Sequence, residues 1–238
     1  AALMSAGFSY LAALSLAVIA VAILGGMAEL ALYRPLYRKG ELSQSLLTFG
    51  LSFVVIAALT SLFGTGMRSL PLPAILNGMV DIGFRTYPAY RLFLIGVGLA
   101  LLLLLSLVID GTLYGARLRA AVDNPRMTQA VGIDVNLLFL VTFAGGCALA
   151  AFGAVIGAEL LPLDPYYALR YLVLFLVVVG VGGLGNFRGS FVAAIVLGLV
   201  DTAAKYLAPN LSSYVFYGLV LALLLWRPQG LMPAKSAT

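Results

Sequence analysis

Few side chains in this 238-residue chain have the chemistry of a catalytic or metal-binding group. The sequence contains no His, so the commonest metal ligand and general base of proteins is missing. Its one cysteine, Cys147, lies in an apolar stretch, where a buried inert thiol is more common than a nucleophile. We therefore predict no catalytic residue, no metal site and no cofactor in this chain.

A second group of polar side chains lies within long apolar runs. Asp201 and Lys205 are four residues apart, a spacing that lets them pair on one helix face. They form either a structural ion pair at a seam between helices or part of a polar path near its outer mouth. Thr48, Ser52 and Thr142 are milder polar groups that could face the same path, although Ser and Thr often bond their own helix backbone.

The most informative loop runs from Gly115 to Val135, and it is basic. Asn124 followed by Pro125 predicts a helix start, because Asn caps free amide groups and Pro fits the first turn. Gly132 can end that helix in a left-handed conformation. The sequence therefore predicts a short helix with a sharp stop.

That short helix is predicted to be amphipathic. Met127, Ala130 and Val131 recur at helical spacing and share one face, whereas Arg126 and Gln129 point elsewhere. Two interpretations remain open for the apolar stripe. It lies on the bilayer surface, or it docks into a groove of a partner protein.

Glycines are concentrated between Gly180 and Gly189, beside Asn186 and Arg188. A phosphate-binding loop would need a following Gly-Lys-Ser/Thr, but the next residues form another apolar run. A packed turn between two helices is the favoured interpretation.

Composition defines the elements that hold these groups. The chain is 63% hydrophobic and 10% charged, far from a soluble domain, and apolar runs approach the ~20 residues that cross a bilayer. We predict one all-α domain over residues 1–238, a polytopic membrane bundle with short cytoplasmic coupling helices at about 113–135. About seven spans are expected: Phe8–Glu29, Ser45–Phe63, Leu92–Ile109, Leu137–Ala158, Ala168–Val181, Ser190–Leu207 and Tyr214–Trp226.

Three further expectations concern loops and contacts. Prolines 71, 73 and 88 break the segment after the second span, which is expected to form a partly ordered outer loop with a short helix. Small residues at Gly153 and Gly157, and at Ser190, Ala194, Gly198 and Thr202, are expected to mark close helix contacts. The chain begins without Met, and we expect the natural protein to extend further upstream.

Positive charges predict the orientation in the membrane. Nine Lys and Arg residues fall in one set of loops, with the C-terminus, and five fall in the other set. The Gly115–Val135 loop and the C-terminus are therefore expected in the cytoplasm. The net charge of +5 reflects this topology rather than nucleic-acid binding.

Several motifs also resemble a known family. From Arg119 to Val135 the string RAAVDNPRMTQAVGIDV resembles the cytoplasmic coupling loop of branched-chain amino-acid ABC-transporter permeases. YRPL at Tyr33, SLLTFGLSF at Ser45, VGGLGNFRGSFVAAIVLGLVDTAAKYLAP at Val181 and LLWRPQGLMP at Leu224 agree with that family and follow in its order.

The resemblance implies one permease subunit of a dimeric channel in the bacterial inner membrane. It implies a second permease subunit, two cytoplasmic ATPase subunits that bind ATP and Mg, and a periplasmic substrate-binding protein. The implied ATPase-coupling residues are Arg119, Asn124, Pro125, Arg126, Met127, Ala130, Val131 and Gly132.

The resulting hypothesis is an ATP-driven importer of branched-chain amino acids. Similar permeases for urea, short amides or aromatic acids remain open, as does a secondary transporter driven by an ion gradient. An intramembrane enzyme is disfavoured, because the chain lacks His and its Asp, Glu and Ser residues are scattered.

Overall fold

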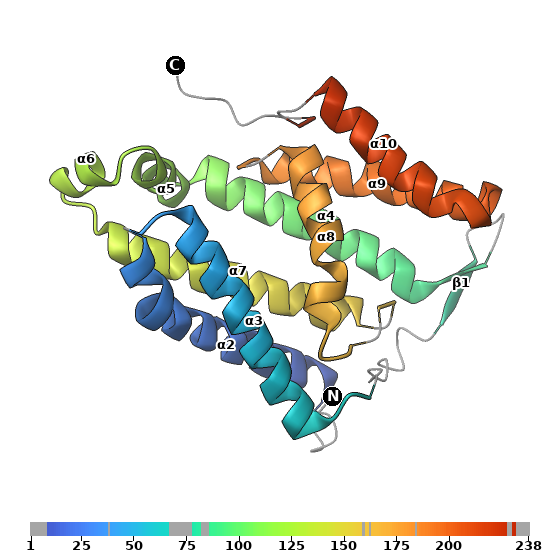
Figure 1. Ribbon diagram of the computed structural model, residues 1–238, viewed down its shortest axis with the longest axis horizontal. Coiled ribbons are helices and arrows are strands. Elements are labelled where there is room, and N and C mark those ends of the chain that lie inside the picture. The colour runs from blue at the N-terminus through green and yellow to red at the C-terminus, as the bar shows by residue number, and fades with distance from the viewer. Residues whose placement is uncertain are drawn as a thin grey trace. The chain divides into compact units, whose positions relative to one another are not determined.

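The fold is almost entirely helical in a computed structural model of the chain (Figure 1). The structure describes residues 9–37, 39–66, 78–81, 86–158, 160–161, 163–183, 185–227 and 230–231. Within these ranges, six helical segments are long and apolar enough to cross a membrane, and α8 is a shorter apolar helix. These helices are α2 (Tyr10–Ala28), α3 (Glu41–Phe63), α4 (Ala89–Gly111), α7 (Val135–Gly157), α8 (Tyr167–Gly182), α9 (Phe187–Leu207) and α10 (Ser212–Trp226).

Short irregular helices extend two of these spans. A π-helix, η1 (Glu29–Tyr33), and a 3₁₀ turn, η2 (Arg34–Leu36), continue α2. A second 3₁₀ turn, η4 (Pro209–Leu211), leads from α9 into α10. Pro35 in η2 and Pro209 in η4 favour these short 3₁₀ turns, because proline fits a first turn but cannot donate a backbone hydrogen bond.

Large apolar side chains cover the outside of these helices. Phe53 on α3 is 59% exposed and Leu103 on α4 is 63% exposed, and every other long helix carries similar residues. Water would not favour such a surface, whereas lipid or an apolar partner would. The prediction of a polytopic helical membrane protein with about seven spans is confirmed, with boundaries that differ by a few residues.

The segment between α3 and α4 holds a strand pair. β1 (Met79–Asp81) and β2 (Thr86–Pro88) are antiparallel, with position 80 opposite Tyr87. The described part of this segment is therefore extended rather than helical, and Pro88 ends the pair directly before α4. The short helix predicted for this segment has no counterpart among its described residues, and positions 67–77 and 82–85 lie outside them.

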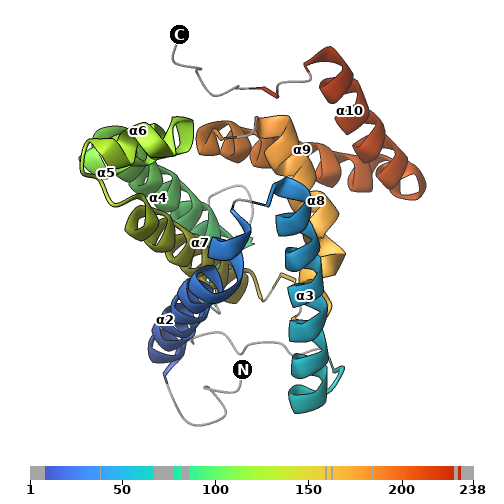
Figure 2. The same ribbon diagram turned by 60° about the vertical axis from the view of Figure 1, so that its left-hand side comes forward.

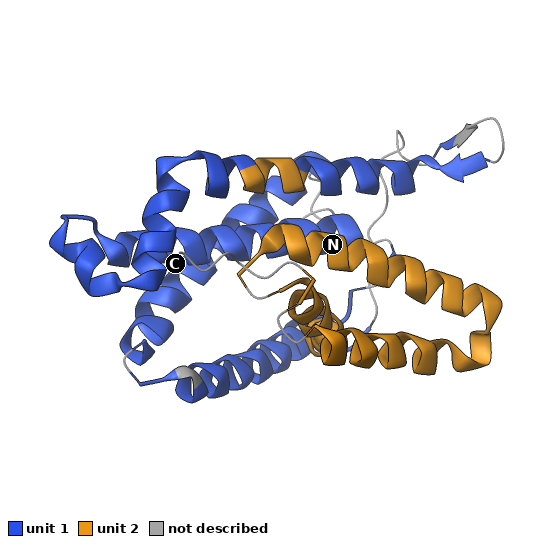
Figure 3. Ribbon diagram, turned by 90° about the horizontal axis from the view of Figure 1, so that it is seen from above, with its two compact units in different colours: residues 1–100, 107–165 blue, residues 101–106, 166–238 orange. Residues whose placement is uncertain are grey.

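The first compact unit comprises residues 1–100 and 107–165 (Figure 3). Its main helix pair is α2 against α7, which lie side by side in Figures 1 and 2. A side chain at Gly25 would collide with Cys147, so the backbone of α2 approaches α7 closely there. Tyr33 and Phe143 stack with ring centroids 5.0 Å apart, and the Tyr90 hydroxyl donates to the carbonyl of Ile156 at the far end of α7.

The second compact unit comprises residues 101–106 and 166–238. Helix α9 packs against both α8 and α10. A buried apolar cluster joins the three helices; its members are Val181, Ala193, Leu197, Phe216 and Val220.

The glycine-rich segment forms a packed turn between α8 and α9, as predicted. A Cβ at Gly182 would overlap the backbone of Ser190, so only glycine permits this approach. Asn186 then caps α9, because its Oδ1 accepts from the amides of Arg188 at 3.1 Å and Gly189 at 3.2 Å. The amide of Leu231 donates to the carbonyl of Val181 at 2.7 Å, which ties the following chain to the same corner.

The small-residue stripes are only partly used within the chain. Among described residues, a Cβ built at Gly153, Gly157 or Gly198 would have no neighbour within 4 Å. The expected close contacts at these glycines are therefore not made among the described residues. Among the described residues, close approaches lie instead at Gly25, Gly115, Gly182 and Gly230, where an added Cβ would overlap neighbouring atoms.

Replacing Gly182 with Ala should destabilise the α8–α9 corner by about 1–3 kcal/mol, because a methyl group must displace the Ser190 backbone. Gly180→Ala is the matched control, since a Cβ there has open space in the described structure. Thermal unfolding of the purified protein in detergent measures both. Equal unfolding temperatures for the two variants would show that Gly182 has more space beside Ser190 than the structure describes.

Candidate functional site

Two short helices link α4 to α7 and form the loop singled out by sequence. They are α5 (Leu113–Asp123) and α6 (Pro125–Ala130), which lie at one end of the α4 and α7 spans (Figure 1). The chain turns sharply into α5. The turn is so close that a side chain at Gly115 would overlap the carbonyl of Ile109. Thr112 caps α5 by accepting from the Gly115 amide at 3.4 Å.

Helix α6 begins as predicted. The Oδ1 atom of Asn124 accepts from the amide of Met127 at 3.1 Å, and Pro125 occupies the first turn. The hydroxyl of Thr128 donates to the Asn124 carbonyl at 2.9 Å on the buried side of the helix. Asn124 therefore caps the N-terminus of α6 and also binds the side chain of its buried residue, Thr128.

Helix α6 also ends as predicted. Gly132 has φ +87, and its amide donates to the carbonyl of Gln129 at 2.9 Å. The amide of Ile133 donates to the carbonyl of Thr128 at 3.3 Å, which completes a Schellman motif. Asp134 follows at once as the cap of α7, so only a short connection separates the two helices.

An apolar contact anchors α5 to α7. Ala121 is fully buried against Val135 and Leu138 in the first turns of α7. The hydroxyls of Tyr114 and Thr142 lie 2.7 Å apart and add a polar link between the same helices. The two short helices are therefore fixed to a membrane span.

The outward face of α6 is apolar and uncovered. Met127 is 67% exposed, Val131 is 80% exposed, and Ala130 lies on the same exposed side. Thr128 is the buried residue of this helix. The predicted short helix is confirmed and its apolar side chains are exposed, while the role of the stripe in binding an ATPase stays a prediction.

Arg119 has a different environment from the rest of the predicted coupling set. Its Nη1 donates to the carbonyl of Ile109 at 2.6 Å and lies 3.7 Å from a carboxylate oxygen of Asp110. A cation at a helix C-terminus is favourable, since the last carbonyls of α4 carry partial negative charge. The described geometry makes Arg119 a positioning residue for the α4–α5 turn.

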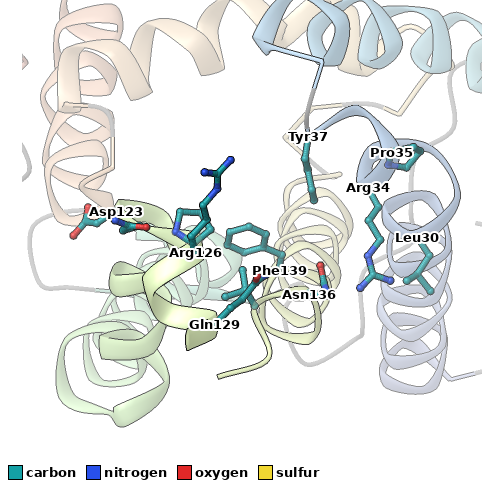
Figure 4. A pocket seen from close by; sticks show the side chains of 12 residues that line it. Leu30, Arg34, Pro35, Tyr37, Asp123, Arg126, Gln129, Asn136 and Phe139 are labelled. Atoms are coloured by element: carbon teal, nitrogen blue, oxygen red, sulfur yellow. The ribbon is translucent and has the colours of Figure 1, made fainter. Parts of the chain in front are cut away.

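A broad cleft of about 1440 Å³ lies between α6 and the end of α2 (Figure 4). Arg126 and Gln129 line it from α6, as their predicted direction away from the stripe requires, and Arg34 lines it from η2. Tyr37 and Phe139 form an aromatic part of its wall, with ring centroids 5.9 Å apart. In the sequence, Arg34 served only as one of the loop charges that predict membrane orientation, and no pattern identified Tyr37. Only the folded chain brings η2 opposite α6.

A buried carboxylate lies behind this cleft. Glu29 is fully buried at the start of the π-helix, and Tyr37 donates to its Oε1 at 3.3 Å. Its Oε2 has no hydrogen-bond partner in the described part of the chain. Burial, followed by the charge of Glu29, raises the pKa of the Tyr37 hydroxyl, so that hydroxyl keeps its proton and can donate. No sequence pattern marked Glu29 beforehand.

The predicted path residues belong to two units, each described by itself. Within the first unit, Thr48, Ser52 and Thr142 each donate to a backbone carbonyl four residues earlier, at 2.8, 2.7 and 2.7 Å. Their hydroxyls thus satisfy their own helices first. In the second unit, Lys205 donates to Asp201 Oδ2 at 2.6 Å beside a groove. Whether any of these residues touches substrate stays a prediction.

The absence of a metal site also stays a prediction. Within the described ranges, no three His, Cys, Asp or Glu residues come together in a way that could hold a metal ion. Cys147 is a free thiol packed against Gly25 in those ranges.

The apolar helices and the short helical link between α4 and α7 together define a multi-pass membrane protein. A family model described as the permease component of a branched-chain amino acid transport system matches residues 1–225. The chain belongs to this family.

Named relatives agree with the family. The high-affinity branched-chain amino acid transport system permease protein BraD of Pseudomonas aeruginosa is 26% identical over 229 residues, covering 93% of this chain and 74% of the relative. The permease protein LivH of Escherichia coli K12 is 24% identical over 225 residues, covering 91% and 72%. A probable LivH of Methanocaldococcus jannaschii is 25% identical over 131 residues, covering 54% and 42%. No solved structure matches the chain.

Gly115→Ala should open the α4–α5 turn, because the added methyl group overlaps the Ile109 carbonyl. We expect trypsin to cleave α5 at Arg117 and Arg119 faster than in the native protein, with a destabilisation of about 1–3 kcal/mol. Gly111→Ala is the control from the same turn, since a Cβ there meets nothing within 4 Å in the described structure. Unchanged cleavage in Gly115→Ala would contradict the described turn.

Proposed function

We propose that this chain is the permease subunit of an ATP-driven importer that moves branched-chain amino acids across the bacterial inner membrane. The family description and the named relatives support the substrate class. The mechanism requires a rigid element outside the lipid that transmits movement of the ATPases to the spans, and we propose α6 for this role.

The exposed stripe of α6 carries this proposal. An apolar surface formed by Met127 and Val131 lies on a helix that is capped at both ends. Because Thr128 of α6 is buried and α5 is packed on α7, a force on the stripe would move the span rather than bend the loop. A groove on a cytoplasmic ATPase would cover the stripe in helix-in-groove fashion.

A continuous set of contacts would carry this movement through the first unit. The α5–α7 anchor leads to α7, and α7 in turn packs on α2 where Gly25 meets Cys147. The aromatic contact between Phe139 and Tyr37 adds a second connection, to the end of α2 beside the cleft. Closure of two ATPases on ATP would thereby shift α7 and α2 together.

The complete transporter would contain further subunits. A permease component is one part of a transport system, and we assign to it a second permease subunit, two ATPase subunits and a periplasmic binding protein. ATP and Mg would be bound by the ATPases, and the permease itself would catalyse no reaction. The open space beside Gly153 and Gly157 in the described structure supports close packing against lipid or the second permease there.

The orientation follows from the alternation of spans. If each long helix and α8 cross once, Arg34, α5–α6, the α8–α9 turn and Arg227 fall on one side. That side holds the larger share of positive charge, so we assign it and the C-terminus to the cytoplasm.

Met127→Asp should uncouple transport while leaving the protein folded in the membrane. A buried unpaired carboxylate would weaken the docking surface, and we expect import to fall at least about tenfold. Membrane insertion and thermal midpoint should stay native, because Met127 is exposed in this chain. Met127→Leu is the control, since it preserves an apolar side chain of similar volume.

The measurement is substrate-stimulated ATP hydrolysis and uptake by the assembled transporter in proteoliposomes. Normal substrate-stimulated hydrolysis in Met127→Asp would reject the coupling role of α6. Uptake by this chain alone on an ion gradient, without ATPases, would favour a secondary transporter instead.

A green fluorescent protein fused after residue 238 should fluoresce in cells, because it folds on the cytoplasmic side. Alkaline phosphatase fused at the same point should be inactive. The reverse pattern would overturn the assigned orientation.

A further inference from the structure

A mostly apolar groove of about 560 Å³ lies among α8, α9 and α10, entirely within the second unit. This volume falls in the roughly 300–1,000 Å³ range of small-molecule pockets. Leu174, Phe175 and Val178 form its wall on α8, and Phe216 and Tyr217 form its wall on α10. The groove therefore offers an aliphatic and aromatic environment along one side.

One face of α9 forms the remaining side. Ala194, Gly198, Asp201 and Lys205 follow one another at steps of four, three and four residues, the spacing of a single helix face. The first two residues are small, and a Cβ at Gly198 would meet nothing within 4 Å in the described structure. The space exists because these positions lack large side chains.

Charge is confined to one end of this face. Lys205 Nζ donates to Asp201 Oδ2 at 2.6 Å, and the two side chains are 64% and 37% exposed. An exposed pair at this spacing adds little to stability. Ionisable residues within a membrane span are nevertheless costly, and they commonly mark the route of a polar substrate.

The groove has a fixed base. Leu197 and Phe216 are buried members of the cluster that joins α9 to α8 and α10. A ligand can therefore enter without rebuilding the core, and only the exposed ion pair has to open.

We infer that this groove is a transient binding site for a zwitterionic amino acid with a branched aliphatic side chain. The Asp201 carboxylate receives the ligand's ammonium group, and the Lys205 ammonium receives its carboxylate. The ligand's side chain lies toward Gly198, against the apolar walls. This inference rests on the proposed function and adds to it the residues that recognise the substrate within the permease.

The charge arrangement explains why a zwitterion suits the site. When the ion pair opens, each of its members gains a new partner of opposite charge, so neither is left unpaired in an apolar setting. A ligand that lacks its ammonium or its carboxylate leaves one of them unpaired. Glycine supplies both charges but leaves the apolar walls empty. Leucine should therefore bind better than glycine, isopentylamine or 4-methylpentanoate.

Thiol protection tests this directly. The full chain carries Gly198→Cys in a Cys147→Ala background, in lipid nanodiscs, and a water-soluble maleimide modifies the introduced thiol. L-Leucine should slow modification several-fold, in a concentration-dependent manner, while the other three compounds at the same concentration should not. Lys205→Gln added to the same protein should weaken protection by leucine about tenfold, the effect of losing one charge-assisted hydrogen bond.

Transport gives an independent readout. In the assembled importer, Gly198→Leu fills the groove and should lower leucine uptake at least about tenfold. Gly218→Leu is the matched control on α10, since a Cβ there is also unopposed in the described structure and the residue does not line the groove. Both variants should reach the membrane at native levels.

The outcomes separate the two proposals. Native import of leucine together with unprotected modification at position 198 would overturn the binding site and leave the proposed function standing. Modification by lipid-soluble maleimides alone, or disulfide-linked dimers through position 198, would show that lipid or a second copy fills the groove, and would also overturn it. Failure of the native importer to carry any branched-chain amino acid would overturn both proposals.

Discussion

The packing of α5 on the first turns of α7 is the contact on which the coupling element depends. Helix α6 has six residues, too few to be stable alone in water. It persists because Asn124 and Gly132 satisfy its ends and because Ala121, buried on Val135, holds the preceding helix against a span. The result is a short helix whose inner side is fixed and whose outer side remains available.

Helix α7 links this element to the rest of the first unit. The first turns of α7 pack against α5. Further along α7, the side chain of Cys147 lies directly over Gly25 of α2. Between these points, aromatic contacts reach the irregular end of α2, where a π-helix begins at buried Glu29. Such π-helical segments often occur at functional sites, and here the segment lies beside the cleft that also contacts α6.

The lipid environment explains why the contacts inside this chain are few and local. Apolar side chains gain little by leaving lipid, so helices associate through close van der Waals packing and through hydrogen bonds between them. Gly25, Gly115 and Gly182 provide the close approaches, and the Tyr114–Thr142 pair provides a polar link. Where glycine meets no neighbour in the described structure, as at Gly198, the same lack of a side chain leaves a groove.

The sequence by itself determined the spans, the start and stop of α6 and its apolar stripe, because these depend on local hydropathy, capping and helical period. It also identified the packed turn near Gly182. Only the tertiary structure decided which residues meet across helices: that Arg119 returns to the end of α4, that Tyr37 reaches Glu29, and that Gly198 lies open while Gly25 is covered. These facts depend on where one helix crosses another, and in an apolar chain many crossings share the same residue pattern, so the pattern alone cannot select among them.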